Sequence, residues 1–195
     1  MPPVRKFSKE EIIISACNII KTEGKESLNA RRLAKSLGCS VQPIFHNFTS
    51  MEELNKEVYN HIYNKYKEYM FKAHQSKIKP YKEMGLAYIR FASDYPEFFK
   101  MIFMQQTSST ANNIIITDDI NTDIIASGQE LTHLSYEEQH EFHLKVWIFT
   151  HGIACLVATK TVEFKEDEIS SLLEETVREM LIGYKYEKGE KKWII

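Results

Sequence analysis

Cysteine is scarce in this chain of 195 residues: Cys17, Cys39 and Cys155 lie far apart and form no C-x-x-C pair. An odd number of scattered thiols suggests neither a disulfide framework nor a zinc knuckle, and it agrees with a reducing cytoplasm. The chain also lacks any run that approaches the roughly 18 uncharged apolar residues of a membrane span, and its N-terminus has no long apolar segment. We therefore expect a soluble cytoplasmic protein that has no membrane partner.

Catalytic motifs are missing as well. The sequence contains no H-E-x-x-H, glycine-rich phosphate loop, G-x-S-x-G or Cys/His dyad signature, so an enzyme is not expected. His140 and His143 stand three residues apart with Glu137 and Glu141 nearby, a spacing that could bind a divalent ion. Because the segment is charged and opens a helix, a solvated face is the preferred interpretation. We expect no metal and no cofactor.

The chain carries little net charge, −2 over its whole length, but the charge is unevenly distributed. Residues 1–47 contain eight lysines and arginines against four glutamates, a net charge of +4 that leaves −6 for the remainder. A basic N-terminal segment on an acidic body suits phosphate binding by one end of the molecule.

Helix signals recur along the chain, whereas convincing strand alternation is lacking. Ser-x-x-Glu capping boxes occur at Ser8, Ser50 and Ser135, and glycines or prolines follow or open several of the apolar-periodic segments. Nine helices are predicted, at about 8–23, 29–37, 41–47, 50–74, 80–93, 96–103, 118–133, 136–160 and 166–186. The predicted fold class is therefore all-α.

Residues 27–54 are the most informative stretch. Asn29 is a good N-cap for a short helix, and Gly38 supplies the left-handed backbone that ends it. Ser40 can cap the next helix, in which Pro43 lies in the first turn and so removes no intrahelical hydrogen bond. Two helices joined by a short glycine-containing turn form a helix-turn-helix unit, whose second helix enters the DNA major groove.

The same stretch resembles the DNA-binding domain of TetR-family transcriptional regulators, specifically over about residues 8–58. The runs L-A-K-S-L-G-C-S, I-F-H-N-F and S-M-E-E-L match the family pattern at Leu33, Ala34, Gly38, Ser40, Phe45, Phe48, Glu53 and Leu54. The resemblance implies a helix-turn-helix DNA-binding domain at 1–49 and a helical ligand-binding and dimerisation domain at 50–195. It also implies a homodimer that binds a palindromic, double-stranded DNA operator and a repressor role relieved by a small ligand.

The resemblance assigns DNA contacts to the two short helices. The residues are Asn29, Arg31, Val41, Gln42, Pro43, Phe45 and His46. Gln42 can pair with adenine, and Val41 and Pro43 can meet thymine methyls. Asn29 and Arg31 are candidates for phosphate contact. For Phe45, simple packing against Phe48 is the alternative interpretation.

The chain departs from the family pattern at several of these places. Gln42 and Pro43 stand where smaller residues are usual, Phe45 lacks a tyrosine hydroxyl, and Met51 replaces a frequent lysine. These departures leave the operator sequence and the affinity open. They also motivate an alternative function, a helical small-molecule-binding or interaction protein without DNA binding.

A second resemblance lies in the C-terminal part. The segments D-Y-P-E-F-F-K-M-I-F at 94–103 and W-I-F-T-H-G at 147–152 are similar to a TetR subgroup marked by a Trp-x-x-x-His-Gly motif. Large adaptable side chains predict an effector pocket lined by Tyr66, Met84, Tyr88, Phe91, Phe99, Phe103, Trp147 and His151. Core packing alone explains such a cluster equally well. The polar segment 105–113 could serve as an entrance, and the expected effector is small, apolar or aromatic, and neutral or cationic.

The last two helices are expected to form the dimer. Helices at about 136–160 and 166–186 would pair with their two-fold mates as a four-helix bundle, with close approach permitted at Gly152. The apolar stripe of the last helix comprises Leu173, Val177, Met180, Leu181 and Tyr184. One side of this stripe must also pack on the chain's own core, so the sequence does not divide inward-facing from dimer-facing positions.

Overall fold

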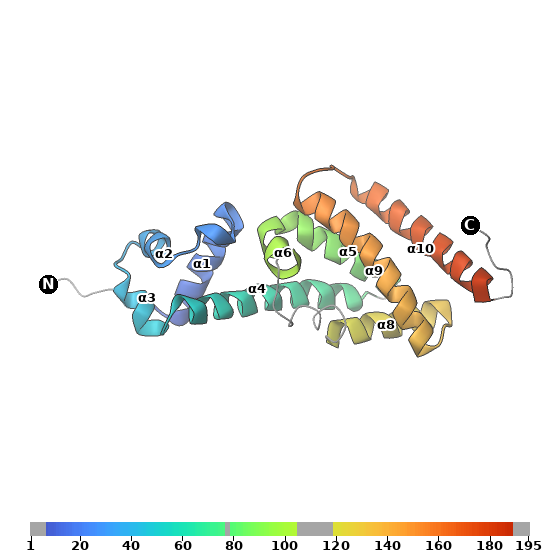
Figure 1. Cartoon of the computed structure of the whole chain (residues 1–195), viewed down its shortest axis with the longest axis horizontal. Coiled ribbons are helices and arrows are strands. Elements are labelled where there is room, and N and C mark those ends of the chain that lie inside the picture. Colours follow the sequence, from blue (N-terminus) through green and yellow to red (C-terminus); the bar gives the residue numbers. More distant parts are fainter. Residues whose placement is uncertain (1–6, 77–78, 105–118, 189–195) are drawn as a thin grey trace. The chain divides into compact units, whose positions relative to one another are not determined.

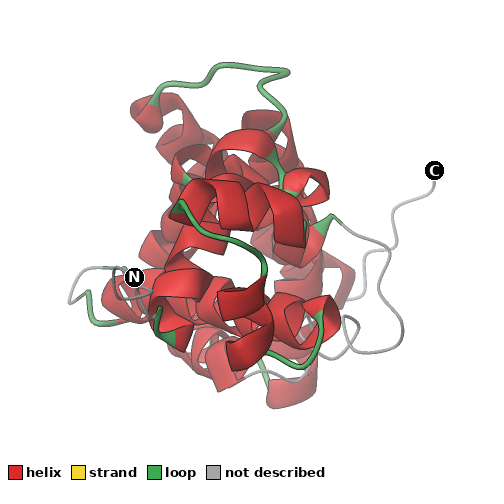
Figure 2. Cartoon of the chain, turned by 90° about the vertical axis from the view of Figure 1, so that its left-hand side faces the viewer, coloured by secondary structure: helices red, strands yellow, loops and turns green. Residues whose placement is uncertain are grey.

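A computed structural model describes residues 7–76, 79–104 and 119–188 of the chain. Within these residues the regular elements are nine α-helices and one 3-10 turn, which confirms the all-α prediction (Figures 1 and 2). The segment 105–113, predicted as an entrance, lies outside the described residues. In the described part of the chain, no helix combines the length and the apolar character that a membrane crossing requires.

The chain folds into two compact units. The first comprises residues 1–66 and 95–106, and the second comprises residues 67–94 and 107–195. The division predicted after residue 49 concerns DNA-binding and ligand-binding roles, and it stays a prediction.

The first unit contains five helices or parts of helices. These are α1 (Lys9–Glu23), α2 (Ala30–Leu37), α3 (Gln42–Asn47), α4 (Met51–His74) as far as residue 66, and α6 (Pro96–Phe103). The core is built from the apolar faces of these helices, with Ile12, Ile20, Leu33 and Leu54 fully buried. Its helix ends are well specified: Ser8 and Glu11 form the predicted capping box, and Gly38 ends α2 with a φ of 68°.

The second unit is arranged around α9 (Tyr136–Ala158). This helix packs against α5 (Pro80–Asp94), α8 (Asp119–Thr132) and α10 (Glu166–Lys188), and α5 makes the most extensive contact. The predicted capping box of Ser135 and Glu138 starts α9, with mutual hydrogen bonds of 3.3 and 2.8 Å. Phe91, Phe142 and Ala154 are fully buried at the centre of the unit.

Two predicted caps are wrong in detail. Helix α3 begins at Gln42, so Val41 and not Ser40 occupies the N-cap position, and no side chain caps this helix. At the start of α4, Ser50 accepts the backbone N–H of Glu53, but the Glu53 carboxylate accepts from the backbone N–H and hydroxyl of Thr49. The two donors of Thr49 lie 2.6 and 2.7 Å from the Glu53 carboxylate. They take the place of the predicted hydrogen bond from the backbone N–H of Ser50 to this carboxylate.

Candidate nucleic-acid interface and ligand-binding residues

Helix α3 is anchored by one face and exposed on the other. Ile44 and Phe48 are 0% and 1% exposed, and they hold the helix against the core of the first unit. The side-chain amide of Asn47 adds hydrogen bonds to the carbonyl oxygens of Phe7 (3.1 Å) and Pro43 (2.9 Å). The helix is therefore fixed in place by residues that a partner molecule does not need to touch.

The predicted reading residues lie together on the opposite side. Gln42 and His46 are exposed, Val41 and Phe45 are 38% and 45% exposed, and Pro43 is half-buried. The side chain of Phe45 is therefore accessible to a partner molecule, whereas Phe48 belongs to the core. The exposure of Phe45 allows DNA contact, and the choice between this role and packing against Phe48 stays a prediction.

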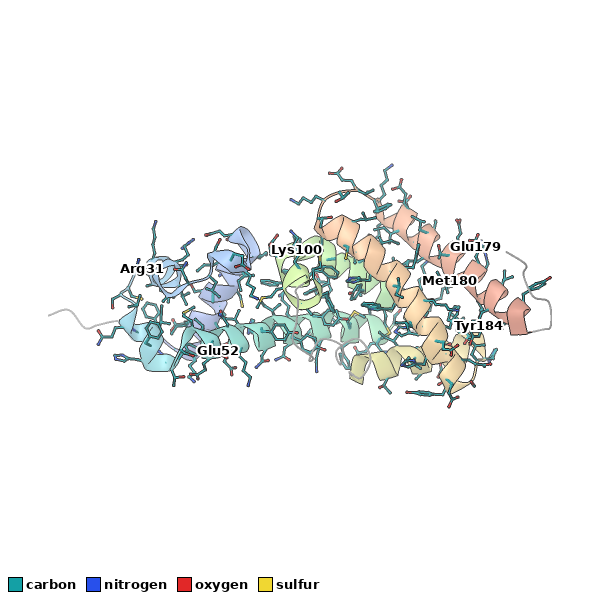
Figure 3. All side chains as sticks on the ribbon, in the orientation of Figure 1. Arg31, Glu52, Lys100, Glu179, Met180 and Tyr184 are labelled. Carbon is teal, nitrogen blue, oxygen red and sulfur yellow. The ribbon has the colours of Figure 1, made fainter. Side chains whose placement is uncertain are left out.

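The two residues predicted to contact phosphate, at the start of α2, differ in whether their side chains already have partners within the chain. The side-chain oxygen of Asn29 accepts the backbone N–H of Arg32 (2.9 Å) and its amide donates to Ser27 (3.3 Å), so Asn29 is used as the helix cap. Arg31 is exposed on the first turn of α2, and no ion pair holds it among the described residues (Figure 3). Its guanidinium is thus available to an external anion.

The neighbouring Arg32 is committed to an internal partner. Its guanidinium donates two hydrogen bonds to the carboxylate of Glu23 on α1, one of them 3.0 Å long from Nε. These hydrogen bonds hold the pKa of Glu23 below its ordinary value. Sequence reasoning missed this pair, because a separation of nine residues across a loop leaves no periodic signal. Two adjacent arginines on α2 therefore have different roles.

The predicted ligand residues fall into both compact units. In the first unit, Tyr66 and Phe99 are buried, and each ring contacts the half-buried Phe103, with centroid distances of 5.2 and 5.1 Å. In the second unit, Met84, Tyr88 and Phe91 are buried, whereas Trp147 and His151 are half-buried.

His151 is held by neighbours on both ring nitrogens. Nδ1 lies 2.9 Å from the Tyr88 hydroxyl, Nε2 lies 3.3 Å from the Cys155 sulfur, and the Trp147 ring stacks on the imidazole at 4.8 Å. Burial lowers the pKa of His151 and raises the pKa of Cys155. Both effects favour a neutral imidazole beside a neutral thiol, which is the opposite of the charged pair that activates a nucleophilic cysteine.

His143 differs from its prediction as a solvated residue. Its Nδ1 lies 3.2 Å from the hydroxyl of the buried Tyr81, and its Nε2 is buried without a hydrogen-bond partner. Burial, with a smaller contribution from His140, lowers the pKa of His143 to about 4. The prediction of a solvent-exposed face is wrong for His143. A spacing of three residues fits the buried side of a helix as well as its exposed side. Among the described residues, no group of three His, Cys, Asp or Glu side chains could hold a metal ion.

Sequence reasoning missed a groove of about 450 Å³ in the second unit. It lies among α5, α8, α9 and α10, and none of the eight predicted ligand residues lines it. Its walls come from four helices distant in sequence, so periodicity within one helix gave no indication of it.

Comparison with known proteins identifies the architecture. No family model matches the chain, and no curated protein matches it significantly. A solved structure, a TetR-like transcriptional regulator from Rhodococcus sp. RHA1, aligns with a TM-score of 0.66 over 93% of this chain and 100% of that one, at 14% sequence identity. Such a likeness establishes the fold and not the function. The helical arrangement of this chain is therefore TetR-like.

Proposed function

We propose that the chain is a non-enzymatic, sequence-specific DNA-binding transcriptional regulator that acts in the cytoplasm as a homodimer. The observation that carries this proposal is the division of α3, in which Gln42, Phe45 and His46 are exposed while Ile44 is buried. A short helix anchored by one face and polar or aromatic on the other is suited to reading base edges. The TetR-like fold supports the same function.

Each exposed group has a proposed role. Gln42 pairs with adenine, and Val41 and Pro43 contact thymine methyls. At Gln42 and Pro43 these contacts take the place of those that the smaller residues usual in the family would make. Arg31 and the N-terminal end of α2 bind phosphate, with Asn29 acting chiefly as the cap that orients this end. Phe45 and His46 contact the groove or its backbone.

The proposed dimer uses an apolar stripe that α9 leaves exposed. Leu144, Ile148, Gly152 and Leu156 recur every four residues and are all exposed. A β-carbon on Gly152 would meet no atom within 4 Å in the single chain, which leaves space for a second helix. Two-fold pairing of α9 and α10 into a four-helix bundle would bury this stripe together with Ile182, which is 62% exposed.

The proposed dimer uses other residues of α10 than the apolar stripe expected from the sequence. Leu173 and Tyr184 are buried within their own unit, and Val177, Met180 and Leu181 are half-buried, so these five residues face largely inward. In the proposed bundle, the outward contacts come from Leu172, Ile182 and Tyr186, which are exposed on the same helix.

Regulation is proposed to be repression relieved by a small effector. A ligand that prefers the state with the wrong spacing of the two α3 helices by a few kcal/mol would release the operator. The predicted cluster around the buried Tyr88 and the half-buried Trp147 remains one proposed effector site.

Binding to the DNA upstream of the chain's own gene, followed by fluorescence anisotropy, tests the central proposal. Gln42→Ala should change the preferred sequence at a cost of about 1–3 kcal/mol. Arg31→Ala should weaken binding to all sequences and reduce the slope of log affinity against log salt by about 0.9. Lys72→Ala, an exposed charge on α4 in the second unit, is the matched control and should change neither quantity.

The operator should be roughly palindromic, with half-sites about one helical turn apart. Binding that is insensitive to salt, or a footprint the size of one half-site, would contradict the proposal. If neither operator-like nor random DNA binds, the alternative of a helical ligand-binding protein without DNA binding replaces it.

A further inference from the structure

The groove in the second unit lies along α10 between two of the contacts that this helix makes with the other helices. At one point, Leu173 Cδ1 lies 3.6 Å from the position that a β-carbon on Gly85 would occupy. At the other, the rings of Tyr184 and Phe142 are 6.1 Å apart. Eleven residues of helix separate these points, a length of about 16 Å. Val177 and Leu181 lie in this interval, line the groove and remain half-buried.

The walls of the groove are apolar, and small residues keep it open. Leu131, Val146 and Leu181 provide apolar surface, and Gly85 on α5 and Ser127 on α8 leave space where larger side chains would fill it. Leu131 is 60% exposed, so its apolar side chain is accessible to a ligand in the groove. The volume of about 450 Å³ falls within the usual range of small-molecule sites, which is roughly 300–1,000 Å³.

Polar groups in the wall offer little to a ligand. The hydroxyl of Thr150 lines the groove, but it donates to the carbonyl oxygen of Val146 at 2.8 Å within its own helix. A ligand held along these walls therefore gains mainly from the burial of apolar surface.

Charged residues at the groove are mostly positive. Lys79 and Lys82 both place their amines near one carboxylate oxygen of Glu174, at 2.6 and 3.0 Å. Their hydrogen bonds, that of Lys79 first, lower the pKa of Glu174 to about 2. Arg178 also lines the groove, and no ion pair engages it among the described residues. Three cations against one carboxylate leave an excess of positive charge.

We propose that this groove binds a small amphiphile with one anionic head group and an apolar tail. The tail lies between α10 and the helices α5, α8 and α9, and the head group lies at Arg178 and the two lysines. Charge complementarity excludes a cationic amphiphile, and the apolar walls exclude a small polar anion. A second copy of this chain fits less well, because the outward apolar residues of α9 and α10 lie elsewhere.

The groove adds a second candidate effector site, whose anionic ligand differs from the neutral or cationic effector expected from the sequence. Only this regulatory consequence rests on the proposed function. The lysines join the start of α5 to α10, a helix of the proposed dimer. An anionic head group would compete with Glu174 for both amines. Ligand binding would thereby change how α10 is held.

Calorimetric titration of the full chain, without DNA, tests the site with decanoate as the probe. Decanol and decyltrimethylammonium have the same tail and a neutral or cationic head. We expect one decanoate per chain, binding about tenfold weaker for decanol, and none detectable for the cation. Equal affinity for all three would overturn the proposed head-group site, and no binding by any of them would overturn the groove as a ligand site.

Substitutions in the groove test where the probe binds. Gly85→Leu fills the groove, replaces glycine with a better helix former, and should abolish decanoate binding. Circular dichroism shows whether this variant folds. If it does not, Val177→Phe fills the groove instead. Arg178→Gln should lower decanoate affinity about tenfold and leave decanol unchanged, whereas Lys72→Gln should affect neither. Undiminished decanoate binding to a folded, filled variant would refute the location. Because DNA is absent, loss of operator binding cannot mimic any of these results.

Discussion

Gly128 on α8 is the position where a single added methyl group should do most damage. A β-carbon there would lie 2.1 Å from Nε2 and 2.9 Å from Cδ of Gln139, and 3.1 Å from Cε2 of Tyr81. Gln139 is 0% exposed, so its side chain cannot swing into solvent to make room. We therefore predict that Gly128→Ala destabilises the second unit, although alanine is the better helix former.

The hydrogen bonds around Gln139 set part of the magnitude. The buried Thr132 hydroxyl lies 2.6 Å from the Gln139 side-chain oxygen position and 3.0 Å from the carbonyl oxygen of Gly128. The hydroxyl has one proton, so it donates to one of these two oxygens at a time, and Nε2 of Gln139 is buried without a hydrogen-bond partner.

Displacement of Gln139 would break this network. A buried polar group left unpaired costs about 1–3 kcal/mol, and overpacking costs a further 1–3 kcal/mol or so. The helix propensity of alanine offsets up to about 1 kcal/mol of that loss. The expected net loss in the free energy of unfolding is about 3 kcal/mol.

Urea denaturation followed by circular dichroism, at one fixed protein concentration, measures this loss. Gly183→Ala on α10 is the control for helix propensity, because a β-carbon at this glycine would meet no atom within 4 Å. In the double variant Gly128→Ala with Gln139→Ala, the overpacking should be relieved, so the two single effects should not add. Additive effects, or a loss below about 0.5 kcal/mol for Gly128→Ala alone, would refute the steric reasoning.

Three further predictions rest on single contacts. His143 has a pKa lowered to about 4, so the unfolded chain binds its proton first; stability should fall by up to about 3 kcal/mol as the pH drops from 6.5 to 4, and His143→Phe should flatten that dependence in pH-resolved denaturation. Ile148→Lys should yield monomers in sedimentation equilibrium, and a surviving dimer would exclude the exposed face of α9 as the interface. Glu23→Gln should free Arg32, strengthen binding to random DNA and steepen its salt dependence by about 0.9 in slope.

Local signals in the sequence were sufficient for most helix boundaries. The capping boxes at Ser8 and Ser135, and the left-handed glycine at Gly38, act within one helical turn and do not depend on the rest of the fold. The same locality explains the error at Ser40. Serine is a good cap at several neighbouring positions, and only the packing of Ile44 fixes where α3 begins.

The contacts that sequence reasoning missed join separate helices. The pair of Arg32 with Glu23 crosses a loop, and the burial of Gln139 depends on the missing side chain of Gly128 on another helix. Gln139 stands among charged residues at the start of α9, where composition predicts solvent exposure. The pattern of residues in one helix does not show where a neighbouring helix leaves space. The groove could not be predicted from the sequence for the same reason.

Helix α10 shows how far periodicity can carry a prediction. Its apolar stripe identifies a face that avoids water, but the residues of this stripe and the apolar residue beside it lie in three different surroundings. Tyr184 packs on Phe142, Leu181 lines the groove, and Ile182, the next residue along, is 62% exposed. Substitutions at these three positions should therefore separate in their effects: loss of stability at Tyr184, loss of ligand binding at Leu181, and loss of the dimer at Ile182. A single shared effect at all three would mean that α10 acts as one undivided surface, and the assignment of separate roles along it would be wrong.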